Sequence, residues 1–110
     1  MKPFFYFATT IAVAALVAGA GFQVYATETE VLSLYKTKCA ACHGTDGRGD
    51  TAMGKKIGVP DLHSPEIAKM KDSDLIEIVW NGKNKMPAYS KRLTKAQTEE
   101  LVKYIRSLKQ

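Results

Sequence analysis

The sequence predicts an all-α protein whose helices are joined by long loops. Apolar residues recur at helical spacing in four segments, and helix-capping residues stand at their starts. No run alternates apolar and polar residues in the manner of a strand. The chain has 110 residues, which is enough for one domain.

The first 26 residues are predicted to be a secretory signal peptide. Lys2 supplies a positive charge, and no charged residue follows until Glu28. Val24-Tyr25-Ala26 offers small or β-branched residues to a signal peptidase, so cleavage is expected after Ala26, with Ala18-Gly19-Ala20 as a second candidate site. An uncleaved membrane anchor is the alternative, since about 20 apolar residues suffice to cross a bilayer. In either case the domain, residues 27–110, lies outside the cytoplasm.

The first predicted helix runs from about residue 29 to residue 42. Thr27 and Glu30 have the spacing of a capping box at its start. Glycines then break the chain into a loop, expected to continue without secondary structure to about residue 62. Such a long loop is unusual in a compact domain, but it is understandable if it surrounds a ligand. The apolar face of the helix consists of Val31, Leu32, Leu34, Tyr35 and Cys39.

Two further helices are predicted in the middle of the chain. Ser64-Pro65-Glu66 opens a short one, because serine caps helices and proline is favoured in the first turn. Another begins at Asp72 or Ser73 and ends at Gly82, since glycine commonly follows the last helical residue. Its apolar face consists of Leu75, Ile76, Val79 and Trp80.

The last predicted helix follows a loop, residues 83–92, that is centred on Met86-Pro87. Thr94 and Gln97 have the spacing of a second capping box at the start of this helix. Apolar residues then recur at helical spacing to the end of the chain. They are Leu101, Tyr104, Ile105 and Leu108.

The motif Cys39-Ala40-Ala41-Cys42-His43 is the feature that points to a function. Two thiols three positions apart on a helical turn can both add to the vinyl groups of one porphyrin, and the next residue brings an imidazole beneath the iron. The spacing therefore predicts one covalent haem c, attached through Cys39 and Cys42, with His43 as an iron ligand.

Three other readings of the cysteines are less favoured. A structural disulfide remains an alternative in principle, and a thioredoxin-like redox pair would sit in a βαβ context that this sequence lacks. A zinc site needs four ligands, and the chain has only one histidine besides His43, namely His63.

A second axial ligand is expected, because the Met/His pair serves electron transfer at raised potential. The candidates are Met53, Met70, Met86 and, less favoured, His63. Met86 is predicted because it lies far from His43 in sequence and precedes a proline, which restricts the backbone. In isolation it would be read as a methionine that fills a gap in the core.

Together these motifs resemble the class I cytochromes c, in particular the short bacterial and c6-like forms. The resemblance covers nearly all of the chain after the signal peptide and implies a small cytochrome c fold, with about four helices and long loops wrapped around one haem. The matching segments are Cys39-Ala40-Ala41-Cys42-His43-Gly44, the glycine-rich loop, Val59-Pro60-Asp61-Leu62, the run from Trp80 to Tyr89, Leu93-Thr94 and the run from Tyr104 to Leu108.

The resemblance also implies roles for single residues. The Pro60 carbonyl would accept a hydrogen bond from the free ring nitrogen of His43 and orient it, although an ordinary turn proline is the alternative. The first and last helices would cross, with Tyr35 and Tyr104 at the contact. Val31 departs from the pattern, because the family usually has glycine there.

With His43 and Met86 both bound to iron, no axial position is open to oxygen or substrate. The sequence also shows no acid–base or nucleophile constellation. It therefore predicts a periplasmic electron carrier that cycles between Fe(II) and Fe(III), and not an enzyme. The alternatives are a cytochrome subunit fixed to a periplasmic dehydrogenase or oxidase and, less favoured, a haem-based sensor or peroxidase.

The formal net charge is +5, and lysines and arginines occur in clusters. Redox protein partners with acidic docking surfaces are therefore expected, with a merely solvated surface as the alternative. Nucleic-acid binding is not expected, because there is no aromatic stacking platform. Membrane association, at the outer face of the inner membrane, is expected only if the N-terminal segment stays uncleaved. The clusters are Lys36/Lys38, Lys55/Lys56, Lys83/Lys85 and Lys91/Arg92/Lys95.

Overall fold

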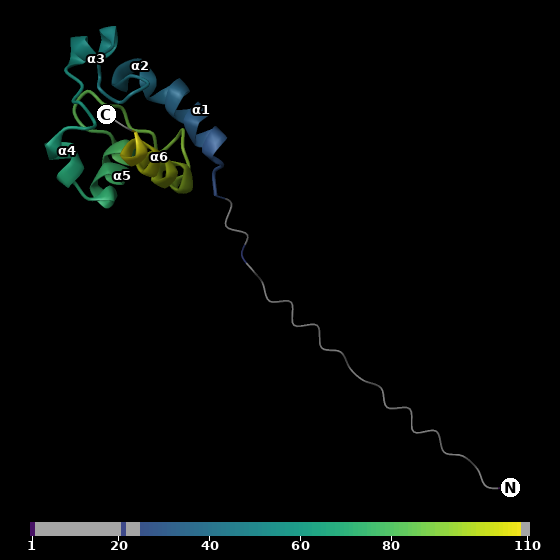
Figure 1. Cartoon of the computed structure of the whole chain (residues 1–110). Helices are drawn as coiled ribbons and strands as arrows, with labels where there is room; N and C mark the ends of the chain where they lie inside the picture. The colour runs from purple at the N-terminus through teal and green to yellow at the C-terminus, as the bar shows by residue number, and fades with distance from the viewer. Residues whose placement is uncertain (2–20, 22–24, 109–110) are drawn as a thin grey trace.

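The structure, a computed structural model, describes residues 1, 21 and 25–108, and helices pack around a small core within them (Figure 1). The predicted signal peptide lies largely outside these residues. Within the described part of the chain no strand is present, and no helix is long and apolar enough to cross a bilayer. The helices are α1 (Glu28–Lys38), α2 (Ala40–His43), α3 (Ala52–Ile57), α4 (Pro65–Lys69), α5 (Asp72–Asn81) and α6 (Lys95–Ser107).

The first predicted helix is interrupted at Cys39, which separates α1 from α2. Cys39 has φ −118° and ψ −40°, and the Cys42 N–H bonds to the Cys39 carbonyl at 3.2 Å. An uninterrupted α-helix would have directed that N–H to the carbonyl of Lys38. The interruption therefore leaves the Lys38 carbonyl outside the helical hydrogen-bond pattern.

The predicted capping box at the start of α1 is only half formed. The Thr27 hydroxyl accepts a hydrogen bond from the Glu30 N–H at 3.2 Å. The Glu30 carboxylate does not return to Thr27 but accepts from Gln97 Nε2 at 3.2 Å. The N-terminal ends of α1 and α6 are joined by this contact.

The prediction that residues 44–62 lack secondary structure is wrong, because α3 lies within them. Thr51 caps this helix by accepting from the Gly54 N–H at 2.8 Å, and Gly58 ends it in the left-handed region at φ 72°. Glycine disfavours helices, yet the backbone of Gly54 is helical in α3. Its missing side chain is required, because a Cβ there would collide with the carbonyl oxygens of Cys42 and Gly49.

Three predicted capping signals of the last helices are formed, whereas Lys71 at the start of α5 makes no side-chain cap. The Ser64 hydroxyl accepts from the Ile67 N–H at 3.4 Å at the start of α4. Gly82, with φ 77°, follows the last residue of α5. The capping box of Thr94 and Gln97 is complete at the start of α6, with both hydrogen bonds present.

The core forms where α6 packs against α1 and α5 (Figure 1). The rings of Tyr35 and Tyr104 meet at the predicted crossing, with centroids 5.1 Å apart and planes at 55°. Val31, which replaces the usual glycine, is buried in the same cluster. The buried apolar side chains among the described residues are few: Val31, Tyr35, Leu75, Leu93, Leu101 and Val102. The all-α class is confirmed.

Candidate haem-binding site

The two cysteines of the motif lie one helical turn apart, at the junction of α1 and α2. Both are half-buried free thiols, so the disulfide alternative is not formed. Burial raises the pKa of the Cys39 thiol to about 11, against the lowering effect of nearby Lys38. Among the described residues, no three side chains of His, Cys, Asp or Glu gather closely enough to hold a metal ion.

His43 ends α2 with its imidazole half-buried. Burial lowers the pKa of His43, so the neutral ring is favoured, and the neutral ring is the form that binds metals. Its buried Nδ1 has no hydrogen-bond partner within residues 25–108. A buried polar atom without a partner is unusual in a folded protein and calls for a physical reason.

The backbone at the end of the motif is hydrogen-bonded to other segments of the chain. The carbonyls of residues 42, 43 and 44 each accept a hydrogen bond from another segment. These contacts fix the direction of the chain beneath the cysteines and the histidine. The bonds are Thr51 Oγ1 to Cys42 O at 3.0 Å, Gly49 N to His43 O at 2.7 Å, and Tyr35 Oη to Gly44 O at 2.7 Å.

The hydrogen bond predicted between His43 and the Pro60 carbonyl is not formed in this structure. The ring nitrogen Nδ1 of His43 is buried and has no hydrogen-bond partner among the described residues. No hydrogen bond to Nδ1 from the described residues fixes the rotation of the ring. The backbone of His43 and the Pro60 carbonyl are nevertheless neighbours through Gly49. The Gly49 N–H bonds to the His43 carbonyl, and a Cβ on Gly49 would lie 3.5 Å from the Pro60 oxygen.

Met86 lies in a tight turn that follows α5. Lys83 and Met86 exchange both backbone hydrogen bonds, at 3.1 and 2.9 Å, and Asn84 between them adopts φ 53°. Gly82 is required beside this turn, since a Cβ there would lie 2.8 Å from the Met86 carbonyl oxygen. Met86 is half-buried, whereas Met53 on α3 is 47% exposed. The turn gives Met86 a well-defined backbone position.

Tyr89 joins the Met86 turn to the rest of the site. Its N–H donates to the Val79 carbonyl at 3.0 Å, and its hydroxyl donates to the Lys38 carbonyl at 2.8 Å. Burial raises the pKa of Tyr89, and the neighbouring Cys39 and Cys42 add to that rise. Sequence reasoning gave Tyr89 no role of its own, because a hydrogen bond across 51 residues leaves no local pattern.

The residues present fit a covalently held haem. The site offers two free thiols, a neutral imidazole with an unpartnered nitrogen, and a thioether on a fixed turn. Apart from the buried Leu75, the large aliphatic and tryptophan side chains from the end of α3 to the end of α5 are only partly buried, as expected if a large apolar group completes the core. They are Ile57, Val59, Leu62, Ile67, Ile76, Ile78, Val79 and Trp80.

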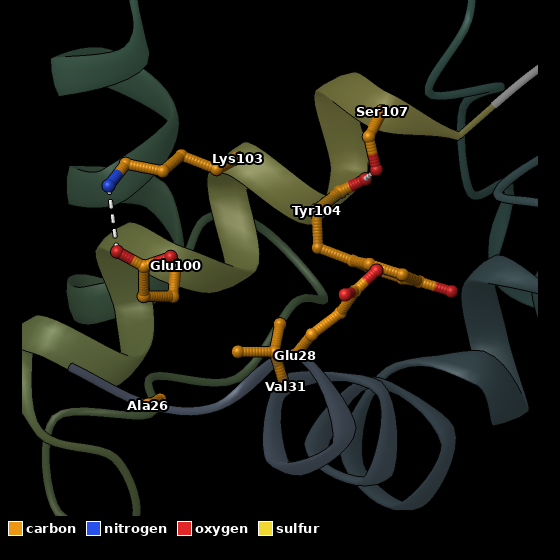
Figure 2. A pocket seen from close by; sticks show the side chains of 7 residues that line it. All are labelled: Ala26, Glu28, Val31, Glu100, Lys103, Tyr104 and Ser107. Carbon is orange, nitrogen blue, oxygen red and sulfur yellow. Dashed lines mark hydrogen bonds and ion pairs between the residues drawn. The ribbon is translucent and has the colours of Figure 1, made fainter.

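Two open grooves in the described part of the chain are lined by neither the two cysteines nor His43 nor Met86. The groove in Figure 2 runs between the start of α1 and α6 and contains the Glu100–Lys103 ion pair at 2.7 Å, but no cysteine, histidine or methionine. A second groove includes His63, whose Nε2 contacts the Asp46 carbonyl at 2.6 Å. His63 thus has a hydrogen-bond partner outside the proposed haem site. The groove in Figure 2 is lined by Ala26, Glu28, Val31, Glu100, Lys103, Tyr104 and Ser107.

Comparison with known proteins identifies the family of this chain. Residues 26–105 match the family described as cytochrome c oxidase, cbb3-type, subunit III. The cbb3-type oxidase subunit CcoP of Azospirillum brasilense is 36% identical over 78 residues, which cover 69% of this chain but only 26% of that protein. Cytochrome c6 of Thermosynechococcus vestitus is 30% identical over 105 residues, which cover 96% of this chain and 91% of the relative.

Solved structures of c-type cytochromes are similar to this chain as well. The KustC0563 c-type cytochrome matches with a TM-score of 0.66 and 31% identity, over 72% of this chain and 96% of that one. Cytochrome cL of Hyphomicrobium denitrificans, at 22% identity and a TM-score of 0.54, shares the fold over 69% of this chain and 44% of its own. This chain therefore belongs to the cytochrome c family, as a c-type cytochrome with one covalent haem c.

Proposed function

We propose that the protein is a periplasmic electron carrier in which His43 and Met86 are the two axial ligands of the iron. The haem supplies an iron that changes oxidation state between Fe(II) and Fe(III). Cys39 and Cys42 hold it as thioethers. The observation that carries the proposal is the fixed turn of Met86, which Tyr89 joins to the cysteine-bearing segment.

Pro60 completes the proposed histidine side of the site. No donor from the described residues bonds to its carbonyl, and the buried Nδ1 of His43 also lacks a partner. The Pro60 carbonyl and the backbone of His43 both lie next to Gly49. A hydrogen bond from Nδ1 to the Pro60 carbonyl would fix the ring orientation and raise the basicity of the ligating nitrogen, as partners of metal-bound histidines generally do.

The relatives offer support for both a free carrier and a fixed subunit. The cytochromes c6 match over most of their own length, which favours a small independent carrier. The CcoP subunits favour a domain attached to an oxidase, but this chain spans only about a quarter of their length. If His43 and Met86 both bound the iron, no iron position would remain for a substrate, and neither role would include catalysis at the haem. A haem-based sensor or peroxidase is the least supported role.

Mass spectrometry of the protein purified from its native periplasm tests the central proposal. We expect one haem bound covalently to a chain that begins at Thr27. A mass without haem would contradict the proposed site, and an intact N-terminal segment would support the membrane-anchored alternative. Elution of the native protein at the size of a single chain would support a free carrier, whereas co-elution with an oxidase or dehydrogenase would support the fixed subunit.

The proposed partner is an acidic redox protein that docks at the Met86 turn. Between Glu77 and Glu99 the chain contains no acidic residue but five basic ones. All five are exposed. They place positive charge on the loop that carries Met86 and on the start of α6. A positive surface at this place raises the rate of encounter with an anionic partner. The residues are Lys83, Lys85, Lys91, Arg92 and Lys95.

Lys85→Glu should slow electron transfer with hexacyanoferrate, a small anionic redox probe. At low ionic strength we expect a rate about threefold to tenfold below that of the unmodified protein, and at high salt the difference should vanish because the charges are screened. Stopped-flow kinetics at several salt concentrations measures both effects. Lys69→Glu on α4 makes the same charge change away from the turn and serves as the control. Equal effects of the two substitutions, or rates independent of salt, would contradict docking at the Met86 turn.

A further inference from the structure

The carbonyl of Lys38 ends α1 without a partner from its own helix. The chain is interrupted at Cys39, so the Cys42 N–H bonds to the Cys39 carbonyl instead. Carbonyls at the end of a helix need partners from elsewhere. Here the partner is the Tyr89 hydroxyl, which donates to the Lys38 oxygen at 2.8 Å. The acceptor that the haem-attachment motif leaves open is thus satisfied by the methionine loop.

The Tyr89 side chain is in turn fixed by its own backbone. Its N–H donates to the Val79 carbonyl at 3.0 Å, and its carbonyl accepts from the N–H groups of Arg92 and Leu93 at 2.8 and 2.9 Å. The Arg92 guanidinium lies over the Tyr89 ring, 5.8 Å from its centroid. The backbone that carries the ring is therefore bonded to α5 and within the loop, and the Arg92 side chain lies against the ring.

This contact is the one side-chain hydrogen bond that we find, within residues 25–108, between the loop 82–93 and the segment 28–43. The other hydrogen bonds that hold the Met86 loop stay inside the loop or join it to α5. The turn with Lys83 acts inside the loop, and the Ser90 N–H donates to the Trp80 carbonyl of α5 at 3.2 Å. They fix the shape of the loop and its place on α5, but not its position relative to the cysteines.

We propose that Tyr89 is the positioning residue that holds Met86 at bonding distance from the iron of the haem on Cys39 and Cys42. This inference rests on the proposed function, in which Met86 is an axial ligand. A neutral thioether competes with external ligands only while its loop stays in place. The apparent affinity for an external ligand rises in proportion to the fraction of molecules whose loop is open.

Tyr89→Phe in the haem-loaded protein tests the proposal, with imidazole as the external ligand of the oxidised iron. Loss of one hydrogen bond of ordinary strength should raise the open fraction, so we expect imidazole to bind roughly threefold to tenfold more tightly. The methionine–iron absorption band should persist without imidazole and disappear at lower imidazole concentrations than in the unmodified protein.

Thr98→Val on α6 is the control, since it removes a buried hydroxyl that donates to the Thr94 carbonyl at 3.0 Å. It should lower the free energy of unfolding but leave the imidazole affinity within about twofold, because its bond does not reach the methionine loop. Unchanged affinity in Tyr89→Phe, or an equal gain in both variants, would overturn the role of Tyr89 while leaving Met86 as ligand. If the unmodified protein shows no methionine–iron band, the proposed ligation itself fails, and the role of Tyr89 fails with it.

Discussion

Met86→Ala should leave the haem attached but open one side of the iron. The attachment through Cys39 and Cys42 does not depend on the methionine loop, whereas alanine offers no lone pair to the metal. We expect the methionine–iron absorption band to vanish and the reduced protein to bind carbon monoxide rapidly. Because the thioether favours Fe(II), the reduction potential should fall by roughly 0.1 to 0.3 V, within the range of about 0.8 V over which axial ligands set haem potentials.

Met53→Ala is the control for this substitution. Met53 lies on α3 with 47% of its surface exposed, so its loss should leave the absorption band, the potential and the slow binding of carbon monoxide unchanged. The assignment of Met86 would be wrong if Met86→Ala kept the band. Loss of the band in Met53→Ala alone would identify Met53 as the ligand.

Gly54→Ala should destabilise the protein, although alanine is the better helix former. In an open helix the change would stabilise by up to about 1 kcal/mol. Here the new Cβ would collide with the carbonyl oxygens of Cys42 and Gly49 and lie 2.9 Å from Thr51 Oγ1. These are backbone groups and a hydrogen-bonded hydroxyl, so they cannot move aside cheaply. We expect the free energy of unfolding to fall by about 3 kcal/mol, as in other overpacked sites, measured by equilibrium denaturation of the haem-loaded protein.

Gly58→Ala separates this collision from simple backbone strain. Gly58 has φ 72°, but a Cβ there would meet nothing within 4 Å. Its substitution should therefore cost only the left-handed conformation, about 1 to 2 kcal/mol. A Gly54→Ala protein as stable as the unmodified one, or less affected than Gly58→Ala, would show that the contact between α3 and the attachment motif is not tight.

Features of this fold that depend on neighbouring residues were predictable from the sequence. The helix starts at Ser64 and Thr94 and the end at Gly82 follow from side chains within three residues of the helix terminus. The haem-attachment motif is equally local. The crossing at Tyr35 and Tyr104 was predictable only through resemblance to a family.

Features decided by distant contacts were not predictable. Glu30 has the right spacing to complete a capping box but is taken by Gln97, which lies 67 residues away. The helix α3 was missed because Gly54 suggests flexibility until the carbonyls around it are known. The role of Tyr89 depends on an acceptor at Lys38 that exists only because the helix is interrupted.

The small core of the described residues has a consequence for the order of assembly. Its buried apolar side chains number six, and a chain this short rarely folds stably on such a core without a further staple. Most of the folding free energy should then arrive with the haem. The chain without haem would spend much of its time open to proteases, so the cell's amount of folded protein would follow its supply of haem and not the rate of synthesis of the chain.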